Sequence, residues 1–224
     1  FVWTILAGLP LSLFNFMKFV SSRRFYLDKY LDLFFNDLSG KVIDIGGKKN
    51  NKRGSFSPSA YDKVNCTYLN IDEDTNPDII SSAESIPLSD NTYDAALLVE
   101  LLEHVENPTE VLKEAYRILK DGGTAIVTMP FLYPVHSDPD DFHRWTKSKI
   151  ENEIIFAGFK IDKIDPMGGL WSVIFDLLRF KVLNKKNLYN RLIVYVIRLV
   201  SRCIVKYEKG NYLITTGWVV FISK

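Results

Sequence analysis

Apolar positions along the chain follow two periods, one helical and one extended. They recur at helical spacing in residues 23–38, 107–120 and 147–157. Short apolar runs that are bounded by glycine, proline or an acidic residue are typical of buried strands. Such runs occupy residues 41–46, 67–72, 93–99, 123–130, 159–165 and 217–223. Because strands and helices alternate, we expect an α/β fold with a doubly wound, mainly parallel sheet and helices on both faces.

The helix expected over residues 107–120 has clear signals at both ends. Asn107 is a suitable N-cap, Pro108 fits the first helical position, and Glu110 stands where a capping box places an acid. Gly122 and Gly123 follow the last apolar positions, as glycines often do after a helix. The pattern therefore predicts a helix between the third and the fourth strand.

Residues 169–209 depart from this alternation and predict a pair of helices inserted before the last strand. From residue 179 to 209 there are nine Lys or Arg and one Glu. Arg191, Arg198 and Arg202 form one helical stripe on an otherwise apolar surface, as in helices that lie at an anionic membrane surface. A lid over an acceptor pocket and a dimer interface are the alternatives.

The first residues of the chain form a separate apolar segment, 1–22, ahead of a main domain over 23–224. Residues 1–17 carry no charge, but a bilayer-spanning helix needs about 20 apolar residues, and Pro10 interrupts the run. Basic residues follow this run instead of preceding it, which argues against a secretory signal. We therefore expect the main domain on the cytoplasmic side, where it could lie peripherally at the inner face of a membrane.

The composition adds little about partners. The chain is 47% hydrophobic with a net charge of +1, which indicates a globular protein and gives no sign of a nucleic-acid partner. The charge is unevenly spread, because residues 71–110 contain eleven acidic residues and no Lys or Arg. An acidic middle and a basic late segment predict two different surfaces, and the oligomeric state stays open.

Candidate binding residues follow the first two strands. In an open α/β sheet, ligands bind beyond the carboxyl ends of the strands. Asp44, Gly46 and Gly47 close the first strand, and the glycines let the backbone approach a ligand closely. Asp72 closes the second, where its carboxylate can accept hydrogen bonds from ribose hydroxyls. This pattern fits a nicotinamide cofactor as well as S-adenosyl-L-methionine (SAM).

Four further motifs distinguish these cofactors. They are Ser-Ala-Glu-Ser-Ile-Pro-Leu at 82–88, Asn-Thr-Tyr-Asp at 91–94, Leu-Glu-His-Val-Glu-Asn-Pro at 102–108 and Arg-Ile-Leu-Lys-Asp-Gly-Gly at 117–123. In this order they resemble the class I SAM-dependent methyltransferases of the type 11 group, over roughly residues 25–165. The resemblance implies a Rossmann-like, seven-stranded sheet and SAM as the cofactor.

The resemblance also implies roles for matching positions. Asp44, Gly46 and Gly47 would hold the methionine part of SAM, Asp72 the ribose, and Ser82 and Ala83 the adenine. We place Glu100, directly after the third core strand, on the cofactor side as well. Two positions depart from the family pattern: Lys48 replaces the second motif glycine, and Ser82 replaces an Asp.

Glu100, Glu103 and His104 form a Glu-x-x-Glu-His unit after the same strand. Positions i, i+3 and i+4 share one helical face, so we expect the three side chains to converge. The unit resembles that of ubiquinone-biosynthesis O-methyltransferases, which implies a divalent metal near the acceptor. Two carboxylates and an imidazole suit Mg, Mn or Zn. Alternatively, Glu103 and His104 only shape the turn.

A second polar cluster follows the fourth strand, at residues 130–146. We expect His136, His143 and Arg144 to contact the methyl acceptor, with His104 as a further catalytic candidate, since a base helps when the acceptor is a hydroxyl. The run resembles methyltransferases encoded with cell-surface polysaccharide genes, which implies a sugar or glycan acceptor. The alternative is a capping network with an Asp141–Arg144 salt bridge.

The function expected from these observations is SAM-dependent O-methylation of a sugar or other polar acceptor, which a lipid could carry. Two other functions stay open. One is a nicotinamide-dependent oxidoreductase, although no second domain supports it and the Leu-Glu-His and Lys-x-Gly-Gly motifs count against it. The other is a methyltransferase-like scaffold without catalysis that binds a partner through its basic insert.

Overall fold

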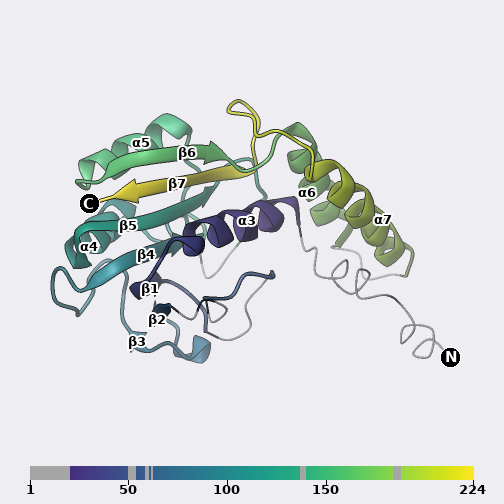
Figure 1. The fold of residues 1–224 in the computed structure, drawn as a ribbon. Coiled ribbons are helices and arrows are strands. Elements are labelled where there is room, and N and C mark those ends of the chain that lie inside the picture. Colours follow the sequence, from purple (N-terminus) through teal and green to yellow (C-terminus); the bar gives the residue numbers. More distant parts are fainter. Residues whose placement is uncertain (1–20, 50–53, 59–60, 62, 137–139, 184–187) are drawn as a thin grey trace.

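A seven-stranded sheet in the order β3-β2-β1-β4-β5-β7-β6 organises the chain (Figure 1). The computed structural model describes residues 21–49, 54–58, 61, 63–136, 140–183 and 188–224. The strands are β1 (Gly40–Ile45), β2 (Val64–Asn70), β3 (Ile79–Ile80), β4 (Tyr93–Val99), β5 (Leu119–Pro130), β6 (Lys160–Pro166) and β7 (Gly217–Ser223). All pairs are parallel except those of β7, which runs antiparallel to β5 and β6. The expected Rossmann-like fold is therefore confirmed.

Helices cover both faces of this sheet, because three of them pack an apolar face on it. The helices are α3 (Ser22–Asn36), α4 (Pro108–Ile118), α5 (Lys147–Phe156), α6 (Leu170–Leu183), α7 (Leu188–Val205) and the short 3-10 helix η2 (Glu73–Thr75). Val111 and Leu112 of α4 and Ile150 of α5 are fully buried in one core cluster. Leu27 and Phe35 of α3 lie in a second cluster on the opposite face.

Several predicted boundaries need correction. Helix α4 ends at Ile118, because Leu119 has an extended conformation and is the first residue of β5. There it pairs with Tyr93, the first residue of β4. Asn107 holds the N-cap position, but its side chain makes no capping hydrogen bond. Strand β2 ends at Asn70, so Asp72 lies two residues beyond it. The two-residue strand β3 was not predicted, since only two hydrophobic residues mark it.

The insert before β7 forms a helical hairpin, α6 and α7, as expected. A buried and a half-buried carboxylate hold it in place. Asp176 of α6 accepts hydrogen bonds from the backbone amides of Ser22 and Arg23, at the start of α3. Glu208 accepts hydrogen bonds from the amides of Trp171 and Ser172, at the start of α6. The hairpin is thus fixed to the sheet domain through helix termini.

Residues 1–20 of the predicted apolar segment lie outside the described residues. Within the part that the structure describes, no helix is both long and apolar enough to cross a bilayer.

Candidate active site

A tight turn after β1 forms the first part of the site. Gly46 has a φ of +78°, and a Cβ there would lie 2.6 Å from Cδ1 of Leu101. A Cβ on Gly47 would lie 2.1 Å from Cγ of Asp44, the penultimate residue of β1. Only glycine fits both positions, and the backbone is left open for a ligand to approach. The three residues therefore form a tight glycine cradle after β1, and their contact with the methionine part of SAM stays a prediction.

Asn70, at the end of β2, is a site residue that the sequence reasoning missed. Its amide nitrogen donates to the carbonyl oxygens of Gly46 and Gly47, at 2.9 and 3.1 Å. Its side-chain oxygen accepts a hydrogen bond from the amide of Asp72, at 3.0 Å. One buried side chain thus ties the glycine turn to the turn that carries Asp72. The sequence signal that could have identified Asn70 is that a polar residue ends an otherwise apolar strand.

The ribose and adenine candidates lie along the same edge of the sheet. Asp72 is exposed and accepts a hydrogen bond from the amide of Asp74, at 3.0 Å. Ser82 and Ala83 follow β3, where Ala83 is buried and the Ser82 hydroxyl accepts from the amide of Glu84. Since β1, β2 and β3 are adjacent and parallel, their carboxyl ends bring the glycine turn, Asp72 and Ala83 to one edge.

The carboxylate of Glu100 is held by Arg23 and does not join Glu103 and His104 as a possible metal ligand. Glu100 has a φ of +53°, so the chain leaves β4 in a turn and not in a helix. Its carboxylate binds Arg23 of α3 in a bidentate pair and also accepts from the Thr128 hydroxyl. Burial alone would raise the pKa of Glu100, but the charge and hydrogen bonds of Arg23 hold it below its usual value. The expected convergence of Glu100 with Glu103 and His104 is therefore wrong.

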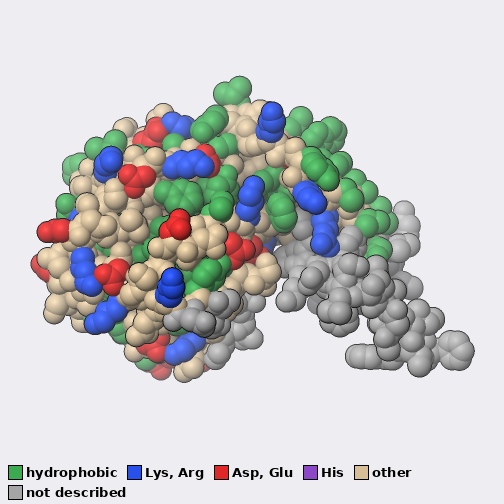
Figure 2. Space-filling view, in the orientation of Figure 1, with side chains coloured by type: hydrophobic (Ala, Val, Ile, Leu, Met, Phe, Trp, Pro, Cys, Tyr) green, Lys and Arg blue, Asp and Glu red, His purple; other side chains and the backbone are tan. Residues whose placement is uncertain are grey.

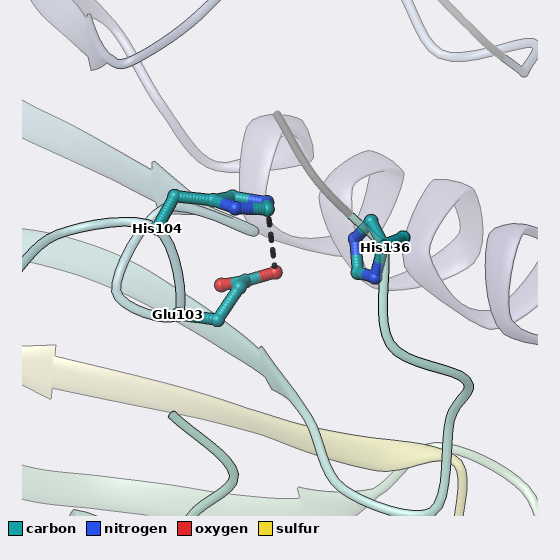
Figure 3. Close-up of side chains that lie close together, drawn as sticks. All are labelled: Glu103, His104 and His136. Atoms are coloured by element: carbon teal, nitrogen blue, oxygen red, sulfur yellow. Dashed lines mark ion pairs between the residues drawn. The ribbon is translucent and has the colours of Figure 1, made fainter. Parts of the chain in front are cut away.

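His136 takes the place of Glu100 beside Glu103 and His104 (Figure 3). One possible ligand atom from each of these residues lies within 4.8 Å of the others. Nε2 of His104 lies 3.7 Å from Oε1 of Glu103. Burial, and then the nearby charge of Glu100, raise the pKa of Glu103 well above its usual value. Burial lowers the pKa of His136, which favours a neutral imidazole.

Arg144 and His143 are the other residues predicted to contact the acceptor. Arg144 is held by a salt bridge, and His143 packs against an aromatic ring. Arg144 binds the carboxylate of Asp141 through both terminal nitrogens, as the alternative reading expected. The same carboxylate accepts from the backbone amide of His136, at 2.9 Å. His143 lies against Trp145, with its ring centroid 5.9 Å away, and is not part of the Glu103 group. Asp141 thus positions the His136 loop, while His143 lies apart from it.

The seven-stranded sheet and its helices have the Rossmann-like fold of methyltransferases. The glycine cradle and the exposed Asp72 fit the amino-acid and ribose parts of SAM. Residues 24–127 match the family model described as a methyltransferase domain, which confirms the class expected from the motifs. The match favours this class over a nicotinamide-dependent oxidoreductase.

Solved structures of methyltransferases share the fold. A SAM-dependent methyltransferase from Archaeoglobus fulgidus aligns with a TM-score of 0.57 at 17% identity, covering 90% of this chain and 94% of that one. Phosphoethanolamine N-methyltransferase 2 from Haemonchus contortus, solved with SAM, has a TM-score of 0.57 at 14% identity and covers 88% of this chain and 51% of that one.

Curated relatives match under half of this chain. Demethylmenaquinone methyltransferase from Paenarthrobacter aurescens is 28% identical over 102 residues, 42% of this chain and 40% of that protein. A mitochondrial 2-methoxy-6-polyprenyl-1,4-benzoquinol methylase from Caenorhabditis elegans is 27% identical over 88 residues, 39% of this chain and 26% of that protein. The chain thus spans less than half the length of these relatives.

Proposed function

We propose that this protein transfers the methyl group of SAM to a hydroxyl oxygen of a polar, sugar-like acceptor that is carried on a lipid. The observation that carries the proposal is the pairing of His104 with His136 beside the buried Glu103, at the ends of β4 and β5. These groups adjoin the glycine turn through Leu101, which contacts the position of Gly46. The acceptor would therefore lie between the imidazoles and the methyl donor.

The chemistry asks mainly for alignment. SAM supplies an activated methyl group on a sulfonium, so the protein needs to hold acceptor and donor in line and to exclude water. The glycine turn and Asp72 would fix the donor. A hydroxyl must lose its proton as the new C–O bond forms, and a neutral imidazole at His104 or His136 can accept it. Arg144, held by Asp141, would contact the polar part of the acceptor.

The α6–α7 hairpin supports a lipid-linked acceptor. Its exposed apolar side chains are Leu170, Trp171, Leu177, Leu178, Tyr195, Val196, Leu199 and Val200. Figure 2 shows hydrophobic side chains over this hairpin with Lys or Arg beside them. Arg198 and Arg202 lie on α7, and the side chain of Arg191 is outside the described part. Apolar residues with adjacent arginines suit insertion at an anionic membrane surface.

A methyl-transfer assay with labelled SAM tests the proposal. The acceptors compared are a polyisoprenyl-phosphate-linked sugar, the same sugar without lipid, and a polyprenyl quinol. We expect methyl transfer to the lipid-linked sugar, with the label in an O-methyl group by mass spectrometry. Methylation of the quinol ring at carbon would refute the acceptor class. Failure to bind SAM by calorimetry would refute the enzyme and favour a scaffold.

A further inference from the structure

A buried carboxylate without a hydrogen-bond partner lies at the centre of the site. The side chain of Glu103 is 0% exposed, and neither of its oxygens has a hydrogen-bond partner among the described residues. Burying a polar group without a partner is costly, so such groups usually meet an ion or another ligand. Arg23, the nearby cation, is already occupied by Glu100 and the carbonyl oxygen of Thr216.

Two imidazoles are oriented toward this carboxylate by their other ring nitrogens. Nδ1 of His104 is hydrogen-bonded to the carbonyl oxygen of Asp140, which leaves Nε2 facing Glu103. Nδ1 of His136 lies 3.2 Å from the carbonyl oxygen of Pro134, 3.5 Å from a guanidinium nitrogen of Arg144 and 3.6 Å from the Asp141 carboxylate. When Nδ1 donates to the Pro134 carbonyl oxygen, the nearest of the three, Nε2 keeps a free lone pair. Metal-binding histidines are typically oriented in this way.

We propose that Glu103, His104 and His136 together bind one divalent transition-metal ion, of which zinc is the natural probe. Their candidate ligand atoms lie within 4.8 Å of one another. With bonds of about 2.0–2.1 Å, a tetrahedral ion needs ligand atoms roughly 3.4 Å apart, so the group would contract by about 1 Å. Two nitrogens and one oxygen suit zinc better than magnesium or calcium, which prefer oxygen ligands.

This set differs from the one expected from the sequence. Glu100 would be a ligand in a Glu-x-x-Glu-His unit, yet its carboxylate is committed to Arg23. His136 comes from the loop after β5, so the ion would join the ends of β4 and β5. The side chains of His104 and His136 are 12% and 27% exposed, which leaves an entry path. Three protein ligands also leave one position open.

The open position suggests a role, and here the inference rests on the proposed function. A bound ion would act as a Lewis acid that lowers the pKa of the acceptor hydroxyl. The proton would leave to solvent, the C–O bond would form, and the C–S bond of SAM would break to give S-adenosylhomocysteine. With the ion present, the histidines would be ligands, and no free imidazole base is needed.

Zinc binding to the full chain tests the inference directly. After chelator treatment and buffer exchange, Zn²⁺ is titrated into the protein in competition with a chromophoric chelator. We expect one site per chain, weakened at least 10-fold by Glu103→Gln and by His136→Ala. Glu106→Gln, an exposed neighbour, should bind zinc like the wild type. SAM affinity, measured by calorimetry for each variant, shows whether the domain remains folded.

The outcomes separate the two proposals. A wild type that binds SAM but takes up no zinc would refute the metal site. So would two ligand variants that bind both zinc and SAM as tightly as the wild type. In either case the proposed methyltransferase function would stand. If Glu103→Gln does not fold, His136→Ala on the half-buried loop decides. Zinc uptake without any SAM binding would instead refute the proposed function.

Discussion

Replacing Arg23 by methionine should strongly destabilise the domain. Arg23 is 3% exposed and holds the Glu100 carboxylate with two nitrogens, one of them at 2.6 Å. It also donates to the carbonyl oxygen of Thr216, at 2.7 Å, and lies over the ring of Tyr133, 5.4 Å from its centre. Arg23→Met leaves the Glu100 carboxylate, which is 22% exposed, without its partner; breaking a fully buried pair costs about 3–5 kcal/mol, so we expect the lower end of that range.

The double variant Arg23→Met/Glu100→Leu isolates the cause. Replacing both members of a buried pair by apolar residues is often close to neutral, so most of the loss should be recovered. About 1 kcal/mol should remain, because the Thr216 carbonyl loses its donor. Urea unfolding at neutral pH, followed by tryptophan fluorescence, measures the free energy of unfolding for each variant.

A surface pair serves as the control. Lys149 lies one helical turn before Glu153 on α5, and its side chain is 53% exposed, so Lys149→Met should cost only about 0.3–0.5 kcal/mol. If Arg23→Met costs no more than this control, the pair does not stabilise the fold. If the double variant is no more stable than Arg23→Met, the loss does not come from the unpaired carboxylate.

Three further predictions concern the cofactor edge and the hairpin. Asp72→Ala should weaken SAM binding by about 1.5–3 kcal/mol in calorimetry, whereas Asp74→Ala should not; equal affinities would remove Asp72 from the site. Gly47→Ala should abolish measurable SAM binding, because the new Cβ overlaps the carboxylate at the end of β1; a variant with normal affinity would contradict the cradle. Arg198→Gln with Arg202→Gln should weaken sedimentation with anionic liposomes by at most about 2 kcal/mol, and a wild type that ignores such liposomes at low salt would refute the membrane surface.

The sequence alone was enough to predict the fold class and the turns that follow the first two strands. The bounds of β4 and β7 agree with the apolar runs at 93–99 and 217–223. The glycines after β1 and the acid after β2 could be recognised in the sequence, because strand periodicity and turn chemistry are local properties. Boundaries were less accurate where Leu119 could continue a helix or begin a strand, since pairing with a neighbouring strand decides that choice.

The acceptor side was decided by tertiary structure, because its residues meet across long sequence distances. Arg23 is 77 residues from Glu100, and no local pattern shows that α3 brings its guanidinium to the end of β4. A helical face was expected for Glu100, Glu103 and His104, but the chain turns at the positive φ of Glu100, and Arg23 holds the Glu100 carboxylate. His136 reaches Glu103 only because β4 and β5 are adjacent and parallel, so their carboxyl ends place both loops at one edge.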